Sequence, residues 1–265
     1  MKKKIYIYNH QGLGDHIHCN GLVRFIIEKN PNSKIYIFVR ENILKMVKFM
    51  YRDEDKIKIV MIPKKIKEEN QYVEDLIYKK KDIIFYKVGF EYIQKNHKNI
   101  NVSETADSLF YRQLKIPYKK RFQKTYWKRD LNKERRVYNK LIEKKPYVFI
   151  HDDAARGFFI PDKLINSKFD IIRNDKSNSI FDYGLILENA SEIHLMESSI
   201  RCMLEFLNPH NCKFYLYKFK NMDHFKSVPF YKKGKMIGSK YLWNFRSLKF
   251  NLPIKNKIIK LISKI

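Results

Sequence analysis

The chain has 265 residues, of which 44% are hydrophobic and 15% aromatic, which is enough apolar material for a packed core and excludes a wholly disordered protein. No apolar run reaches the roughly 18 residues that a membrane-spanning helix needs. The formal net charge of +27 is large, and such a charge is typical of proteins that contact nucleic acid or an anionic membrane.

Strands and helices alternate in the first half of the chain. Short runs of β-branched and aromatic residues predict strands, and apolar residues at helical spacing predict the helices between them. The predicted strands are 4–8, 34–40, 56–62 and 82–87, and the predicted helices are 17–27, 43–51 and 72–80. This alternation favours βαβ units with a parallel sheet.

The second half repeats this pattern after a highly charged joint, which we expect to be partly helical. The predicted strands there are 147–151, 169–173, 192–196 and 213–219, and the predicted helices are 180–189 and 198–207. We therefore predict an α/β protein of two Rossmann-like halves with mostly parallel sheets facing a cleft. The predicted domains are 1–120 and 147–265, with a basic joint over 121–146. Ligands of such sheets bind outside the carboxyl ends of the strands.

The positive charge is concentrated in two stretches. Segment 111–146 has fourteen basic and three acidic residues, a net charge of +11, and segment 213–265 has fourteen basic and one acidic residue, a net charge of +13. Either Lys simply occupies every solvated face, or these stretches form two surfaces that face phosphate groups.

The last segment, 254–265, predicts a basic amphipathic helix. Its Ile and Leu residues fall on one helical face and its lysines mostly elsewhere. Such a helix could lie on an anionic membrane surface or dock on the core of its own chain.

The three cysteines, Cys19, Cys202 and Cys212, are odd in number and lack paired spacing, which argues against a disulfide framework or a Cys-rich zinc site. The pattern of the N-terminus predicts a first strand and not a signal peptide. We therefore expect a cytoplasmic protein, with membrane association as an option.

The first candidate site is the turn after the first predicted strand, which contains Gly12, Gly14 and Asp15. Glycines let the backbone approach a ligand closely, and the start of a helix offers free N–H groups to anions. The dinucleotide fingerprint would need Gly at Ile17, and a Walker loop is also missing. Asp15 is either a general base for a hydroxyl or only the cap of the helix.

Two histidines follow this turn. His16 and His18 are spaced neither for one helical face nor for a known zinc site, and such residues are commonly ordinary loop histidines. We take Asp15 and its neighbour His16 as the candidate catalytic residues.

The second candidate site follows the predicted strand 147–151 and contains His151, Asp152 and Arg156. Arg156 could hold a phosphate by bidentate hydrogen bonds, and His151 could donate to the same group or to a sugar hydroxyl. The alternative is an Asp–Arg ion pair that organises a loop. Asp152 and Asp153 are neighbours and should point apart, so we predict no metal site here.

The third candidate site is Glu197, Ser198 and Ser199, between a predicted strand and a helix. The serines can cap the helix and present donors to a diphosphate, and Glu197 can accept hydrogen bonds from ribose hydroxyls. The alternative is an ordinary N-cap serine.

Two stretches resemble GT-B glycosyltransferases, in particular the heptosyltransferase-like group. In GLGDHIHCNGLVRFI, Gly14 and Asp15 match a Gly-Asp pair whose Asp is the proposed catalytic base of the family. SIFDYGLILENASEIHLMESSIRCMLEFL resembles the nucleotide-binding half, in which Glu197, Ser198 and Ser199 would form the turn over the donor diphosphate.

This resemblance implies sugar transfer from a nucleotide-sugar donor to a hydroxyl of a glycan or lipid-linked acceptor. Asp15 would deprotonate the hydroxyl, and His151, Arg156 and the serine turn would stabilise the leaving diphosphate. Such enzymes generally use protein donors in place of a metal, so we expect no metal and no cofactor.

A different class remains open, a basic protein that binds nucleic acid or another polyanion without catalysis. Tyr and Lys alternate in YRQLKIPYKKRFQKTYWKR, which could stack on bases and neutralise phosphates. Because no recognisable nucleic-acid-binding module is present, we regard nucleic acid as an unlikely partner.

Overall fold

The protein is represented by a computed structural model that describes residues 3–9, 12–96, 106–153, 159–162, 165, 168–175, 177–196, 198–219, 230–232, 235–238 and 243–248. The chain divides into two compact units, Met1–Arg129 and Asp130–Ile265. This division falls inside the segment 121–146 that we predicted as a joint. The predicted helix over 254–265 lies outside the described residues.

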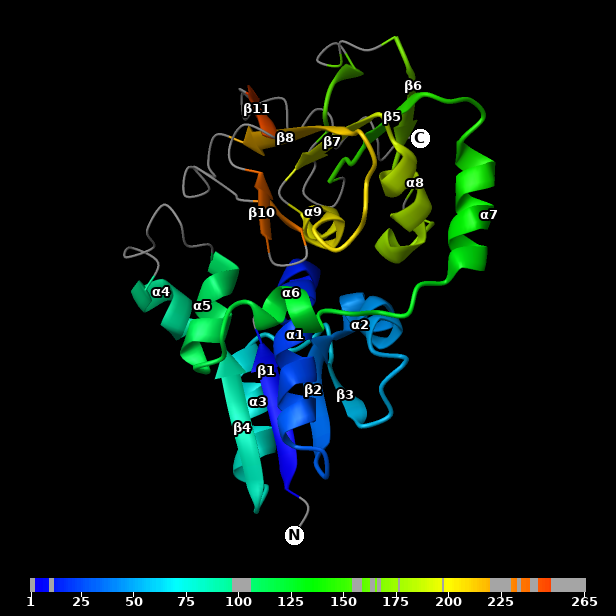
Figure 1. The fold of residues 1–265 in the computed structure, drawn as a ribbon. Helices are drawn as coiled ribbons and strands as arrows, with labels where there is room; N and C mark the ends of the chain where they lie inside the picture. Colours follow the sequence, from blue (N-terminus) through cyan, green and yellow to red (C-terminus); the bar gives the residue numbers. More distant parts are fainter. Residues whose placement is uncertain are drawn as a thin grey trace. The chain divides into compact units, whose positions relative to one another are not determined.

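The first unit is built on a parallel sheet of four strands, in the order β3-β2-β1-β4. The strands are β1 (Lys4–Asn9), β2 (Lys34–Arg40), β3 (Ile57–Ile62) and β4 (Ile83–Val88). The helices are α1 (Leu13–Lys29), α2 (Leu44–Met50), α3 (Glu69–Tyr78), α4 (Glu91–Asn96), α5 (Ala106–Gln113) and α6 (Lys120–Lys124). Figure 1 shows α1 in front of this sheet and α3 behind it.

β1 is an inner strand of this sheet, and both of its faces are buried. Tyr6 and Tyr8 pack with Val73 of α3, while Ile5 and Ile7 on the opposite face are fully buried as well. An uninterrupted apolar run is typical of a parallel strand that is covered on both sides. The turn that follows β1 is therefore anchored by the most buried strand of the unit.

A glycine lets α6 approach α1 closely. A Cβ atom at Gly21 would lie 2.8 Å from the carbonyl oxygens of both Lys120 and Arg121, and 2.9 Å from Oγ1 of Thr125. Atoms at such distances overlap, so only glycine fits at this position of α1. The contact holds α6, which apart from Lys120 lies in the predicted basic joint, against α1 within the first unit.

The second unit is built on a five-stranded parallel sheet in the order β11-β8-β7-β5-β6. Its strands are β5 (Tyr147–Ile150), β6 (Asp170–Arg173), β7 (Glu192–Met196), β8 (Lys213–Phe219) and β11 (Trp243–Leu248). β9 (Phe230–Lys232) and β10 (Lys235–Gly238) form a separate antiparallel pair. The helices are α7 (Leu131–Leu141), α8 (Gly184–Asn189) and α9 (Ser199–Leu204).

Alternate residues of β5 enter two different cores. Val148 and Ile150 pack with Met196 and Tyr217 on one face. On the other face, the Tyr147 hydroxyl donates to the carbonyl oxygen of Ile186 at 2.8 Å. Every residue of β5 is therefore buried.

The predicted α/β class with mostly parallel sheets in both halves is confirmed. The predicted strands 34–40, 192–196 and 213–219 have the observed bounds. α1 begins four residues earlier than predicted, because Gly12 starts the helix directly. The predicted helix 180–189 begins as a 3-10 turn at Ile180–Tyr183, and α4, α5, β9, β10 and β11 were not predicted.

We predict that Gly21→Ala destabilises the first unit by about 1–3 kcal/mol, because α6 must move away from the added methyl group. The measurement is urea denaturation followed by the fluorescence of Trp127, in a Trp243→Phe background so that one of the two tryptophans remains. Lys29→Ala, at an exposed position of the same helix, is the control and should change the free energy of unfolding by less than about 0.5 kcal/mol. An equal effect of the two substitutions would contradict the packing of α6 on α1.

Candidate functional site

The first predicted site lies where β1 leads into α1. The backbone N–H of Gly12 donates to Oδ2 of Asp15 at 3.0 Å, so Asp15 does act as a cap of the first helical turn. A Cβ atom at position 12 would lie 2.7 Å from this same carboxylate oxygen, so a larger residue there would displace the capping carboxylate. The positive end of the helix dipole stabilises a carboxylate in this position. Capping therefore holds the proposed base in place, and Gly14 lies beside it in the same turn.

His16 is almost fully buried in α1, with 1% of its surface exposed. Burial lowers the pKa of His16 from its ordinary value of 6.5 to about 4, and the charge of Arg40 acts in the same direction against the opposing effect of Asp15. Its Nε2 atom has no hydrogen-bond partner among the described residues. His16 is therefore an uncharged side chain near neutral pH and can take part in chemistry only as a neutral imidazole.

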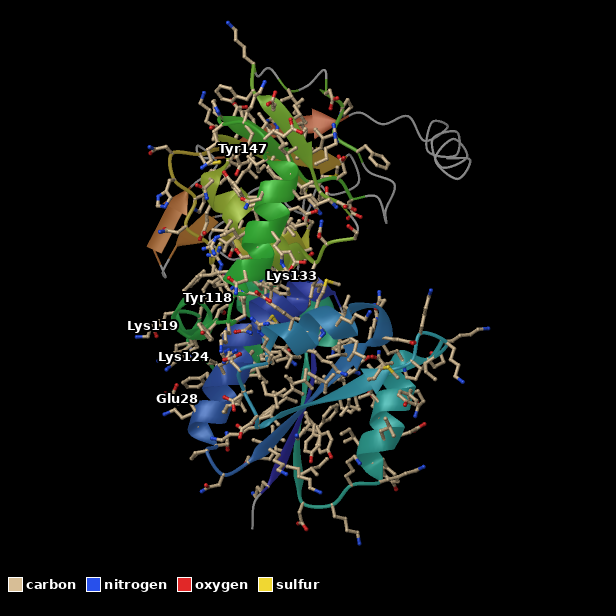
Figure 2. All side chains as sticks on the ribbon, turned by 90° about the vertical axis from the view of Figure 1, so that its right-hand side faces the viewer. Glu28, Tyr118, Lys119, Lys124, Lys133 and Tyr147 are labelled. Atoms are coloured by element: carbon tan, nitrogen blue, oxygen red, sulfur yellow. The ribbon has the colours of Figure 1, made fainter. Side chains whose placement is uncertain are left out.

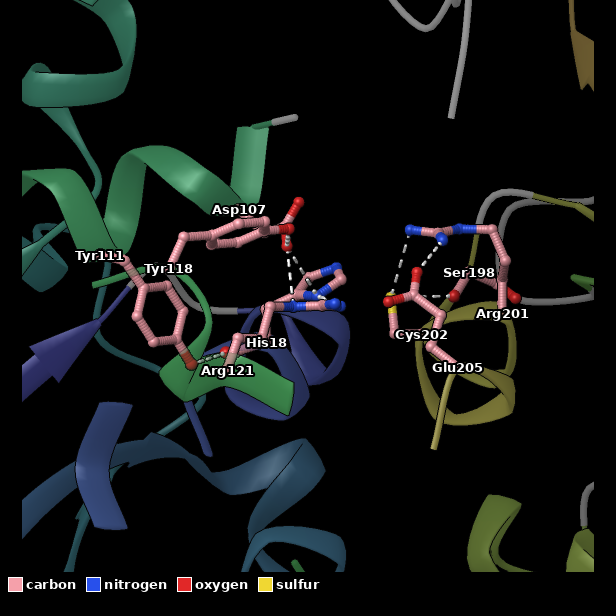
Figure 3. A network of polar contacts seen from close by, with 9 residues as sticks. All are labelled: His18, Asp107, Tyr111, Tyr118, Arg121, Ser198, Arg201, Cys202 and Glu205. Atoms are coloured by element: carbon pink, nitrogen blue, oxygen red, sulfur yellow. Dashed lines mark hydrogen bonds and ion pairs between the residues drawn. The ribbon is translucent and has the colours of Figure 1, made fainter. Parts of the chain in front are cut away.

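His18 belongs to a buried polar network that we did not predict (Figure 3). Its Nδ1 atom lies 2.5 Å from a terminal nitrogen of Arg121. Because a guanidinium can only donate, Nδ1 accepts this hydrogen bond. Arg121 in turn forms an ion pair with Asp107, in which Nε lies 2.8 Å from Oδ2. The same carboxylate oxygen accepts a hydrogen bond from the Tyr118 hydroxyl at 2.7 Å. The network joins α1, α5 and α6, and no local pattern in the sequence points to it.

In the second unit, two predicted site residues meet. His151 follows β5 and Ser198 follows the neighbouring strand β7. Oγ of Ser198 lies 3.1 Å from Nδ1 of His151. Ser198 occupies the N-cap position of α9 but makes no side-chain capping hydrogen bond. Its hydroxyl therefore contacts His151 instead of capping the helix. The pair stands at the carboxyl ends of adjacent parallel strands.

Asp152 has a clear structural task. Its Oδ1 accepts from the backbone N–H of Ile160 at 2.9 Å, and its Oδ2 forms an ion pair with Arg173 at the end of β6. Arg173 also pairs with Asp162. An Asp–Arg ion pair thus organises this loop, and the arginine that pairs with Asp152 is Arg173.

Glu205 is buried on α9, with 3% of its surface exposed, and accepts from Arg201 at 2.5 Å (Figure 3). Arg201 is itself 4% exposed and was not among our candidates. Oppositely charged residues four apart on a helix, as these are, lie close enough to pair. This ion pair joins Arg201 inside α9 to Glu205, the residue that follows the end of the helix.

Arg156 and Glu197 lie outside the described residues. Ser199 is the first residue of α9 and is partly buried. Within the described ranges, no three His, Cys, Asp or Glu side chains gather as metal ligands would, and no helix is long and apolar enough to cross a membrane.

The comparisons with known proteins give a match in structure only. No protein-family model matches the sequence, and no curated protein is significantly similar to it. The family 9 glycosyltransferase from Veillonella parvula matches with a TM-score of 0.51 at 10% identity, over 99% of this chain and 90% of that one. TibC of enterotoxigenic E. coli, an iron-containing heptosyltransferase solved with ADP-D-β-D-heptose, matches with a TM-score of 0.50 at 12% identity, over 88% of this chain and 62% of that one.

The chain shares the fold of these two solved structures. This confirms, for the fold, the resemblance to the GT-B heptosyltransferase-like group. In parallel α/β sheets of this kind ligands bind outside the carboxyl ends of the strands. The turn at Gly12 and Asp15 follows β1, and His151 and Ser198 follow β5 and β7, so these candidates lie at that edge of their own sheets.

We predict that buried His16 makes the protein less stable as the pH falls. The unfolded chain binds a proton near pH 6.5 while the folded chain does so only near pH 4, so stability decreases across this interval by up to roughly 3 kcal/mol. Urea denaturation at several pH values should show a shallower decrease for His16→Gln. His210→Gln, at an exposed position, is the control and should keep the wild-type slope. Parallel pH profiles for all three proteins would show that His16 titrates normally.

Proposed function

We propose that this protein is a glycosyltransferase that moves a sugar from a nucleotide-diphosphate sugar to a hydroxyl of a glycan or glycolipid acceptor. The observation that carries the proposal is the His151–Ser198 contact at the carboxyl edge of the second sheet, in a chain with a glycosyltransferase fold. TibC, which shares this fold, was solved with a nucleotide-diphosphate sugar, and this supports a donor of the same class.

The second unit supplies the groups that bind the donor. The imidazole of His151, held by Ser198 at 3.1 Å, is proposed to bind a diphosphate oxygen together with the first backbone N–H groups of α9, which a helix leaves without partners inside the helix. Negative charge develops on the diphosphate as its bond to the sugar breaks, and donors fixed in advance stabilise this charge. Arg156, Glu197 and Ser199 are proposed to complete this set.

The first unit supplies the base. Asp15 takes the proton of the acceptor hydroxyl as the new bond between that oxygen and the sugar carbon forms. The diphosphate leaves with the electron pair of the broken bond, so atoms and charge balance without a redox partner. Because protein donors stabilise the leaving group, we expect the reaction to proceed in the presence of EDTA.

Donor binding tests the second unit. In a thermal-shift panel of UDP, GDP, ADP, CDP and pyrophosphate, one nucleoside diphosphate should stabilise the protein more than pyrophosphate does. His151→Ala and Ser198→Ala should each weaken the affinity for that nucleotide by about tenfold or more, because one hydrogen bond to a charged group is lost. His210→Ala removes an exposed imidazole and should bind as wild type does.

The same panel contains a short single-stranded DNA. An equal response to every polyanion, or a response to DNA alone, would contradict the proposal and indicate a basic binding protein instead. A nucleotide response that the His151 and Ser198 variants leave unchanged would place the donor elsewhere on the chain.

Catalysis tests the first unit. We expect Asp15→Asn to lower kcat by about 10²–10⁴-fold, since general-base catalysis contributes an effect of this size, while nucleotide affinity stays unchanged. The measurement is release of nucleoside diphosphate from the donor identified by binding. Asp55→Asn removes an exposed carboxylate of the same unit and should leave kcat unaltered. Full activity of Asp15→Asn would exclude Asp15 as the base.

A further inference from the structure

Helix α7 has two sharply different faces. At about 100° per residue, Glu134, Val137, Tyr138 and Leu141 fall on one side. Glu134 and Val137 are buried there, and the Tyr138 ring packs against Tyr147 with centroids 6.2 Å apart. This face attaches the helix to the second unit.

Apart from Leu131 at its first position, the exposed residues of α7 are all cations and amides. They are Asn132, Lys133, Arg135, Arg136, Asn139 and Lys140. All of these side chains can donate hydrogen bonds, and none is a carboxylate. We call this set the α7 basic face. Figure 2 is turned so that α7 lies at the front of the second unit, with Lys133 labelled at its start.

Most of this positive charge is not neutralised within the described part of the chain. Lys133 pairs with Asp182 at 3.0 Å. Arg135 and Arg136 have no carboxylate partner there. Lys140 forms no ion pair, although its charge helps hydrogen bonds from Ser177 to lower the pKa of Asp175.

An unbalanced face of this kind costs the helix stability. Arg136 and Lys140 are four residues apart, and like charges at this spacing repel each other. Helices that only face solvent commonly mix both signs of charge on the exposed side. The repulsion on α7 is relieved when an anionic partner covers the face.

We propose that the α7 basic face docks on an anionic lipid surface. A convex row of guanidinium, ammonium and amide groups fits a flat layer of phosphate headgroups by charge complementarity. The face lacks an exposed aromatic ring, since Tyr138 packs inward, so it has no platform on which nucleic-acid bases could stack. The docking is independent of sugar transfer and needs no donor.

The test is cosedimentation of the full chain with phosphatidylcholine vesicles that contain or lack phosphatidylglycerol. Wild type should bind the anionic vesicles, less so as salt rises, and not the neutral ones. The triple variant Arg135→Gln, Arg136→Gln, Lys140→Gln should bind roughly a hundredfold more weakly, at about fivefold per cation. Because the replaced residues are exposed, the variant should keep the wild-type circular dichroism spectrum. The single variant Arg136→Gln should weaken binding to the anionic vesicles by about fivefold.

The matched control is Lys65→Gln, Lys67→Gln, Lys81→Gln, which removes the same charge from exposed positions of the first unit. It should bind anionic vesicles within about twofold of wild type. Equal losses in the two triple variants would attribute binding to overall charge and overturn the proposal. Unchanged vesicle binding by the α7 variant would overturn it as well, and so would a loss of single-stranded DNA binding without a loss of vesicle binding.

Discussion

The parallel hydrogen-bond ladder between β5 and β7 determines where the second unit places its candidate site residues. Ile150 is paired with His194, and the backbone N–H of His151 donates to the His194 carbonyl oxygen at 2.9 Å. Two neighbouring parallel strands therefore end side by side, which brings the His151 and Ser198 side chains within hydrogen-bond distance. The first unit uses the same geometry, because β1 lies between β2 and β4 and leads directly into the turn that carries Asp15.

Arginine–carboxylate pairs hold the framework around these edges. Asp107 pairs with Arg121 in the first unit, and Glu205 pairs with Arg201 in the second. Both arginines are almost completely buried. Removing one partner of such a pair is strongly destabilising, because an uncompensated charge would then remain inside the protein. Part of the positive charge counted in the sequence thus serves the fold and is not available to a ligand.

Two kinds of anion contact are proposed for this chain, and they use different chemistry. The His151–Ser198 pair offers a few fixed donors at a strand edge, which suits the localised charge of a leaving diphosphate. The α7 basic face offers several unpaired cations on a convex helix, which suits a diffuse layer of phosphates.

The sequence by itself determined the α/β class and the positions of most strands, because buried parallel strands appear in a sequence as apolar runs. It also determined the position of the turn with Gly12 and Asp15, because this turn directly follows one of those runs. Only the tertiary structure decided the partners of the site residues. Ser198 contacts His151 across 47 positions and His18 contacts Arg121 across 103. Contacts this distant leave no periodic signal in the sequence, since strand order and helix packing alone bring the partners together.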